Sequence, residues 1–170
     1  MTAVERAWYA LRTRSNCERK VVRFIEGRGA PETFLPTYRA KTRRLGVMRV
    51  VERPLFTGYV FVALGGDGSE RVAALQAPGA VGFVCFGGRT ARIDDRTMRS
   101  LRILVSRSDE ARPHPLLREG QAVRVVDGPF AGATGKVSRG RGRKPRLVVT
   151  IEILGRAAAA PIDLRDVEPF

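Results

Sequence analysis

Basic side chains are the residues of this sequence best suited to chemistry, because Lys and Arg total 31 against 17 for Asp and Glu. The net charge of +14 attracts polyanions, since neutralising phosphates releases condensed counterions. Nucleic acid, or an assembly that carries it, is therefore the expected class of partner. The alternative is that the charge serves solubility alone.

Groups that catalyse reactions are scarce. The single histidine, His114, lies between two prolines, where the geometry of a Ser-His-Asp or Cys-His arrangement is hard to fix. Cys17 and Cys85 lie in apolar surroundings and are expected to be reduced core thiols, and with one histidine they do not supply a usual zinc site. The Gly-rich segment 65–68 lacks the Lys-Ser/Thr of a phosphate-binding loop. We therefore expect no enzyme, no metal and no cofactor.

Membrane-directing segments are not found in the sequence. Residues 1–8 lack the apolar run of a signal peptide, and no apolar run approaches the roughly 20 residues that span a bilayer. We expect a cytoplasmic monomer that does not bind membranes.

Strands are expected throughout the first part of the chain. Short aromatic or apolar runs predict strands at 8–12, 34–38, 58–64 and 81–86. A basic segment at 39–53, broken by Leu45-Gly46, is interpreted as a hairpin that projects from the sheet.

Helices are expected between these strands. Ser15 and Glu18 form an S-x-x-E capping box that predicts a helix start, and further helices are expected from Ser69 and from Asp94 or Asp95. Residues 1–107 are thus predicted to form an α+β domain, in which an antiparallel sheet is flanked by helices.

The second part of the chain has a different residue pattern, with short predicted strands and many turns. Residues 108–115 are polar and proline-rich and predict a linker. Strands at 122–126, 147–153 and 160–164, with dense turns, predict a small all-β barrel over 116–170. The positive charge of this part is concentrated in five residues, Arg139, Arg141, Arg143, Lys144 and Arg146.

Several stretches, in this order, carry a family resemblance: Trp8-Tyr9, 54–62, 78–84, 120–125, 127–132 and 135–137. Together they resemble the NusG family, which includes RfaH-like and other specialised paralogues. The resemblance implies a NusG N-terminal (NGN) domain at 1–107, a linker at 108–115 and a KOW domain at 116–170. Whether the chain is a housekeeping or an operon-specific member stays open.

The resemblance implies a transcription elongation or antitermination factor that packs against the clamp helices of RNA polymerase and suppresses pausing. By resemblance, the polymerase-binding residues are Trp8, Tyr9, Phe56, Tyr59 and Phe83, although aromatic residues on strands are also typical of a core. Relatives approach the non-template DNA strand near the first helix, which implies DNA binding by Arg12, Arg14, Arg19, Lys20 and Arg23. The alternative there is an ordinary solvated helix face.

The resemblance gives the KOW domain a recruiting role. Housekeeping members bind ribosomal protein S10 or the Rho terminator, and Phe130 is the candidate partner-binding residue. The basic segment 139–146 leads to the hypothesis that this KOW domain binds nascent RNA, the alternative being a solvated turn. Two competing functions are a ribosome-associated RNA-binding KOW protein and an enzyme that acts on nucleic acid.

Overall fold

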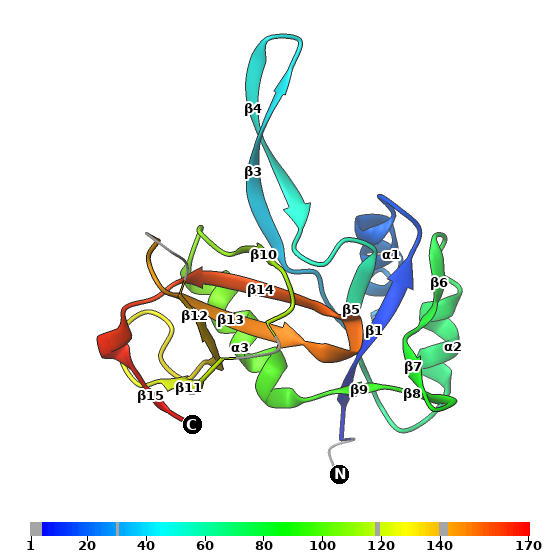
Figure 1. Ribbon diagram of the computed structural model, residues 1–170. Helices are drawn as coiled ribbons and strands as arrows, with labels where there is room; N and C mark the ends of the chain where they lie inside the picture. Colours follow the sequence, from blue (N-terminus) through cyan, green and yellow to red (C-terminus); the bar gives the residue numbers. More distant parts are fainter. Residues whose placement is uncertain (1–4, 30, 118–119, 140–142) are drawn as a thin grey trace. The chain divides into compact units, whose positions relative to one another are not determined.

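A computed structural model describes residues 5–29, 31–117, 120–139 and 143–170, and its helices and strands are labelled in Figure 1. The chain divides into two compact units, Met1–Leu35 with Phe56–Asp95 and Pro36–Leu55 with Arg96–Phe170. The strand pairings of the described residues are antiparallel, and three α-helices accompany the sheets. The predicted α+β class is therefore confirmed.

The first unit contains a sheet with the strand order β2-β5-β1-β6, and β9 also pairs with β1. The strands of this sheet are β1 Ala7–Thr13, β2 Glu32–Phe34, β5 Tyr59–Leu64, β6 Ala80–Phe83 and β9 Arg92–Ile93. Two helices and a small hairpin complete the unit, α1 Glu18–Glu26, α2 Ser69–Leu75, β7 Cys85–Phe86 and β8 Arg89–Thr90.

One face of this sheet packs on helix α1. Val21 and Ile25 are one helical turn apart on α1 and are fully buried against Leu11 of β1 and Val60 and Val62 of β5. Burying each such aliphatic side chain contributes about 1.5–3 kcal/mol. The apolar spacing of the helix thus fixes which sheet face it covers.

The predicted capping box at the start of α1 is wrong. Helix α1 begins at Glu18, Cys17 occupies the N-cap position, and no side chain caps it. The Glu18 side chain is buried and instead accepts a hydrogen bond from the backbone N–H of Gly58 at 2.8 Å. A partly buried N–H needs an acceptor, and the carboxylate of Glu18 supplies it across 40 residues of sequence.

The second unit contains a sheet with the strand order β10-β14-β13-β12-β11-β15. Its strands are β10 Arg112–His114, β11 Ala122–Val125, β12 Thr134–Ser138, β13 Arg146–Ile151, β14 Arg156–Pro161 and β15 Val167–Pro169. The unit also holds helix α3, two 3-10 turns and the basic hairpin, α3 Asp95–Arg107, η1 Glu152–Leu154, η2 Leu164–Asp166, β3 Thr37–Arg44 and β4 Val47–Pro54.

Small side chains form the centre of the C-terminal sheet. Strand β14 contributes the buried alanines 157–160, of which 158–160 pair with the larger buried residues Val149, Val148 and Leu147 of β13. Gly135 of β12 is so close to β13 that an added Cβ would lie 2.4 Å from the carbonyl oxygen of Val148.

Helix α3 packs within the second unit. The Oγ of Ser100, which is fully buried, accepts a hydrogen bond from the backbone N–H of Thr134 at 2.9 Å. Strand β10 lies within the range predicted as a linker and pairs with β14. The domain boundaries at 107 and 116, and closure of the C-terminal sheet into a barrel, stay predictions.

Candidate functional site

An aromatic row crosses the sheet face opposite α1. Trp8, Phe34 and Phe61 occupy this face of β1, β2 and β5, because they alternate with the residues that pack on the helix. The ring centroids of Trp8 and Phe34 are 6.5 Å apart, and those of Phe34 and Phe61 are 6.3 Å apart. Trp8 and Phe34 are partly exposed, whereas Phe61 is buried. The row therefore offers aromatic surface on a rigid base.

The five predicted polymerase-binding residues do not form one patch. Trp8 and Tyr59 lie on the face of the aromatic row, and both are partly exposed. Tyr9 and Phe83 lie on the opposite face, packed at the edge of the core that α1 covers. Phe56 is 1% exposed, with its ring edge-on to Phe61 at 5.6 Å, so it supports the aromatic row from beneath and offers no direct contact surface.

Tyr9 and Phe83 have a cationic neighbour in helix α2. The guanidinium of Arg71 lies 6.0 Å from the Tyr9 ring centroid and 5.6 Å from that of Phe83. Arg71 also donates a hydrogen bond to the hydroxyl of Thr90 in β8. A cation held over two ring faces is a stabilising arrangement within the first unit, so these two aromatics already have a structural role.

The five predicted DNA-binding residues are all exposed: Arg12, Arg14, Arg19, Lys20 and Arg23. The connection between β1 and α1 is fixed by backbone hydrogen bonds from Thr13 to Gly58 and from Arg14 to Gly79, each 2.8 Å. Glu18 is the one acidic residue of segment 12–23, and its side chain is buried. The exposed surface of this segment is consequently cationic, although DNA binding itself stays a prediction.

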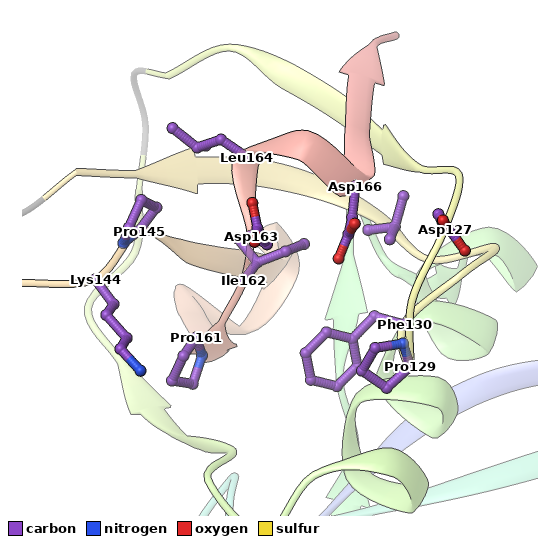
Figure 2. A pocket seen from close by; sticks show the side chains of 11 residues that line it. Asp127, Pro129, Phe130, Lys144, Pro145, Pro161, Ile162, Asp163, Leu164 and Asp166 are labelled. Carbon is purple, nitrogen blue, oxygen red and sulfur yellow. The ribbon is translucent and has the colours of Figure 1, made fainter.

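The loop that contains Phe130 lines a cavity of about 570 Å³ in the C-terminal part (Figure 2). Phe130 is 5% exposed, so its ring forms part of the cavity wall and does not protrude. Pro129 lies beside Phe130, and Ile162 and Pro161 contribute further apolar surface. The predicted partner-binding residue is thus part of an apolar recess, and partner binding by it stays a prediction.

Carboxylates surround this apolar recess. Asp127, Asp163 and Asp166 line the cavity together with one cation, Lys144. Hydrogen bonds from the side chain and backbone of Arg165 lower the pKa of the Asp163 carboxyl to about 2. Arg165 also compensates the charge of Asp163 in an ion pair of 2.7 Å, so the acidic character of the cavity edge comes chiefly from Asp127 and Asp166.

The predicted RNA-binding segment lies between strands β12 and β13. Arg139, Arg143 and Lys144 are exposed, and Arg146 is partly buried in β13. Arg141 lies outside the described residues. RNA binding by this segment stays a prediction.

The two cysteines differ from the expectation of buried core thiols. Both are free thiols, but Cys17 is only partly buried and Cys85 is exposed. Cys85 lies in β7, which within the described residues pairs with the two-residue strand β8, apart from the larger sheet of the first unit.

The described ranges contain neither a metal-binding cluster nor a membrane-spanning helix. There, no group of three or more His, Cys, Asp or Glu side chains gathers as a metal site would require. No helix of the same residues is both long enough and apolar enough to cross a bilayer.

Sequence reasoning missed three residues of the first unit. Phe34 and Phe61 complete the aromatic row, and both lie in strands that the sequence predicted. The period-2 alternation of these strands could have indicated which face each ring occupies, but not that β2 and β5 are paired. The role of Arg71 depends on the meeting of α2 with β1 and β6, for which local sequence holds no signal.

Comparison with known proteins identifies the family. The NusG family model, described as transcription termination factor nusG, matches residues 6–102. The chain is 32% identical to transcription termination/antitermination protein NusG of Pseudomonas aeruginosa over 95% of this chain and 97% of the relative. It is 34% identical to the protein of the same name from Escherichia coli strain K12, over 81% of this chain and 77% of the relative. The chain belongs to the NusG family.

A solved structure supports the fold. The structure described as domain interaction in Thermotoga maritima NusG aligns with 98% of both chains, with a TM-score of 0.57 and 24% identity. At this level of identity the likeness concerns the fold alone.

Proposed function

We propose that this chain is a transcription elongation and antitermination factor that acts in the cytoplasm by binding RNA polymerase. Membership of the NusG family and the names of its relatives, transcription termination/antitermination proteins, support this role. The function requires binding only, in keeping with a basic chain that offers few groups for catalysis.

The aromatic row carries the polymerase contact in this proposal. Trp8 and Tyr59 are partly exposed on a rigid sheet face, as aromatic residues at the centre of protein interfaces commonly are. The clamp helices of the polymerase would lie across this face, and an apolar helix side is the complement of such a surface. Arg12 pairs with Tyr59 in the β1-β5 register and therefore lies on the same sheet face. In this proposal its positive charge would contact nucleic acid beside the polymerase-binding surface.

Single-round transcription tests the polymerase contact. We expect the native protein to shorten pauses, and a Trp8→Ala, Tyr59→Ala variant to lose that effect. The matched control is Tyr9→Ala, Phe83→Ala, which removes two aromatics from the opposite sheet face. Circular dichroism and thermal melting establish that both variants are folded. Equal loss of pause suppression in both variants would assign the effect to stability and would contradict the proposed contact face.

The C-terminal sheet is proposed to recruit a second partner. The apolar recess at Phe130, with its carboxylate edge, suits a protein segment that presents an apolar side chain next to basic residues. Ribosomal protein S10 and Rho are the candidates that the family supplies, and the segment of Arg139, Arg143 and Lys144 is the candidate for nascent RNA. An Asp127→Asn, Asp166→Asn variant should weaken binding of the protein partner, while Arg139→Gln, Arg143→Gln, which leaves the cavity lining unchanged, should weaken binding of RNA.

A further inference from the structure

The basic hairpin β3-β4 has no role in the polymerase and partner contacts proposed above. It forms a two-stranded sheet of its own, and each strand is eight residues long (Figure 1). The hairpin carries six cations against the single acid Glu52, and the cations are Arg39, Lys41, Arg43, Arg44, Arg49 and Arg53. Among the described residues, Lys41, Arg43, Arg44 and Arg49 form no ion pair. Their charge is thus available to an external anion.

The strand register places cations on both faces of the hairpin. Arg39, Lys41 and Arg43 alternate along β3 and share one face, while the other three cations lie on the opposite face. All six are exposed. A partner protein covers one face of a ribbon, and charged residues are depleted at the centre of protein interfaces. Three cations on each face favour a ligand that has negative charge on both sides of the ribbon.

The tip of the hairpin is apolar and conformationally unusual. Leu45 is 96% exposed and has a φ of 50°, followed by Gly46 at 78°. Positive φ at both positions is the geometry of a two-residue type I′ turn, in which Leu45 bears a backbone strain of about 1–2 kcal/mol. Val47, Met48 and Val50 are also more than half exposed. The ribbon therefore combines phosphate-binding cations with exposed apolar side chains.

These features distinguish among nucleic acids. Single strands are bound by stacking on exposed aromatics, but Tyr38, the hairpin's one aromatic, is partly buried at its base with Arg112 over the ring at 5.4 Å. Duplex RNA has a major groove too deep and narrow for protein side chains to read. The major groove of B-form DNA is about 12 Å wide and admits a two-stranded ribbon, with phosphates on both sides and thymine methyl groups at its floor.

We propose that hairpin β3-β4 is a duplex-DNA-binding ribbon that inserts into the major groove. Cations on its two faces would contact the phosphates of the two groove walls. The apolar side chains are divided between the same two faces, Met48 and Val50 beside Lys41 and Arg43 and Val47 beside Arg44, and would reach past the phosphates toward the base edges. Eight residues at about 3.4 Å each span about 27 Å, the length of roughly eight base pairs. The binding is of low sequence specificity, because cations contact phosphate and apolar contacts select only methyl groups.

The test measures the affinity of the full chain for a DNA duplex of roughly 16 base pairs, twice the expected site, over a series of salt concentrations. The variant is Lys41→Gln, Arg43→Gln, Arg49→Gln. Its charge-matched control is Arg89→Gln, Arg99→Gln, Arg107→Gln, which removes three exposed cations elsewhere. Each lost phosphate contact lowers the magnitude of the slope of log K against log salt by about 1. The slope of the hairpin variant should therefore be smaller than that of the native protein by about 3, and the slope of the control should change much less.

Two further readouts decide the class of ligand. The native protein should bind duplex DNA more tightly than single-stranded DNA or duplex RNA of the same length. It should also protect guanine N7, a major-groove atom, from dimethyl sulfate, and the hairpin variant should not. Equal salt slopes for variant and control, a loss of affinity for duplex RNA in the hairpin variant equal to its loss for duplex DNA, or absence of N7 protection would each overturn the proposal. Because the probe is free DNA, these outcomes do not depend on the polymerase contact.

Discussion

The N-terminal sheet is packed with large aromatic and aliphatic side chains, whereas the centre of the C-terminal sheet contains small residues. In the first, β5 presents Phe61 on one face and Val60 and Val62 on the other, so the sheet needs a covering layer such as α1. In the second, the buried alanines of β14 and Gly135 of β12 allow strands to approach closely. The first sheet should therefore be destabilised by substitutions that make a buried side chain smaller, and the second by substitutions that make one larger.

Removal of volume from the aromatic row should give the largest effect. Phe61→Ala should lower the free energy of unfolding by about 3–5 kcal/mol, because the cavity it leaves is only partly refilled. Trp8 is the one tryptophan and lies in the same row, so its fluorescence during chemical denaturation reports this loss. Phe86→Ala is the control, since Phe86 is 81% exposed and should change stability little. Similar losses in both variants would contradict the assigned core.

Addition of volume tests the C-terminal sheet. In Gly135→Ala, the new Cβ would lie 2.4 Å from the carbonyl oxygen of Val148, and β12 and β13 would have to separate. We expect a loss of about 1–3 kcal/mol, measured by faster hydrogen exchange of the β13 amides. Gly66→Ala adds the same methyl group where nothing lies within 4 Å and should be tolerated. A stable Gly135→Ala protein with slow exchange in β13 would show that the close approach is not needed.

The sequence predicted these two sheets unequally. Strands β1 and β5 and helix α1 followed from aromatic content and apolar periodicity, because short-range patterns report which face is buried. In the C-terminal part, β11 and β13 were predicted, whereas the strand expected at 160–164 is β14 at Arg156–Pro161. The pairing of β10 with β14 was not predicted, since an Arg-Pro-His segment carries no strand pattern. The binding residues stay predictions, but the sequence did not show that Trp8 and Tyr9 face opposite sides of the sheet, because strand register decides this.

In each unit, one buried polar side chain of a helix accepts a hydrogen bond from a backbone N–H in or next to the sheet. Removal of such an acceptor should cause a loss of stability of intermediate size. Glu18 accepts from Gly58 in the first unit, and Ser100 accepts from Thr134 in the second. Glu18→Ala leaves the Gly58 N–H without its acceptor and should cost about 1–3 kcal/mol, measured by urea denaturation. Glu18→Gln retains an oxygen acceptor and should recover part of the loss. If Glu18→Gln is no more stable than Glu18→Ala, the hydrogen bond is not what stabilises this junction.

The smallest effect concerns a surface pair of the C-terminal part. The pKa of Asp163 is lowered from 3.8 to about 2 by hydrogen bonds from Arg165. A lowered folded-state pKa means that the stabilisation is present above pH 3.8 and is lost as the pH falls toward 2. NMR titration of the Asp163 carboxyl should therefore give a midpoint well below 3.8.

Arg165→Gln is the control for this titration, because it removes the guanidinium donor but keeps the backbone N–H of residue 165 that also donates to Asp163. The midpoint should rise toward, but not reach, the ordinary value. An unchanged midpoint in Arg165→Gln would assign the shift to the backbone hydrogen bond. The acidic edge of the Phe130 cavity would then be fixed by the turn η2 itself, and it would persist whatever residue occupies position 165.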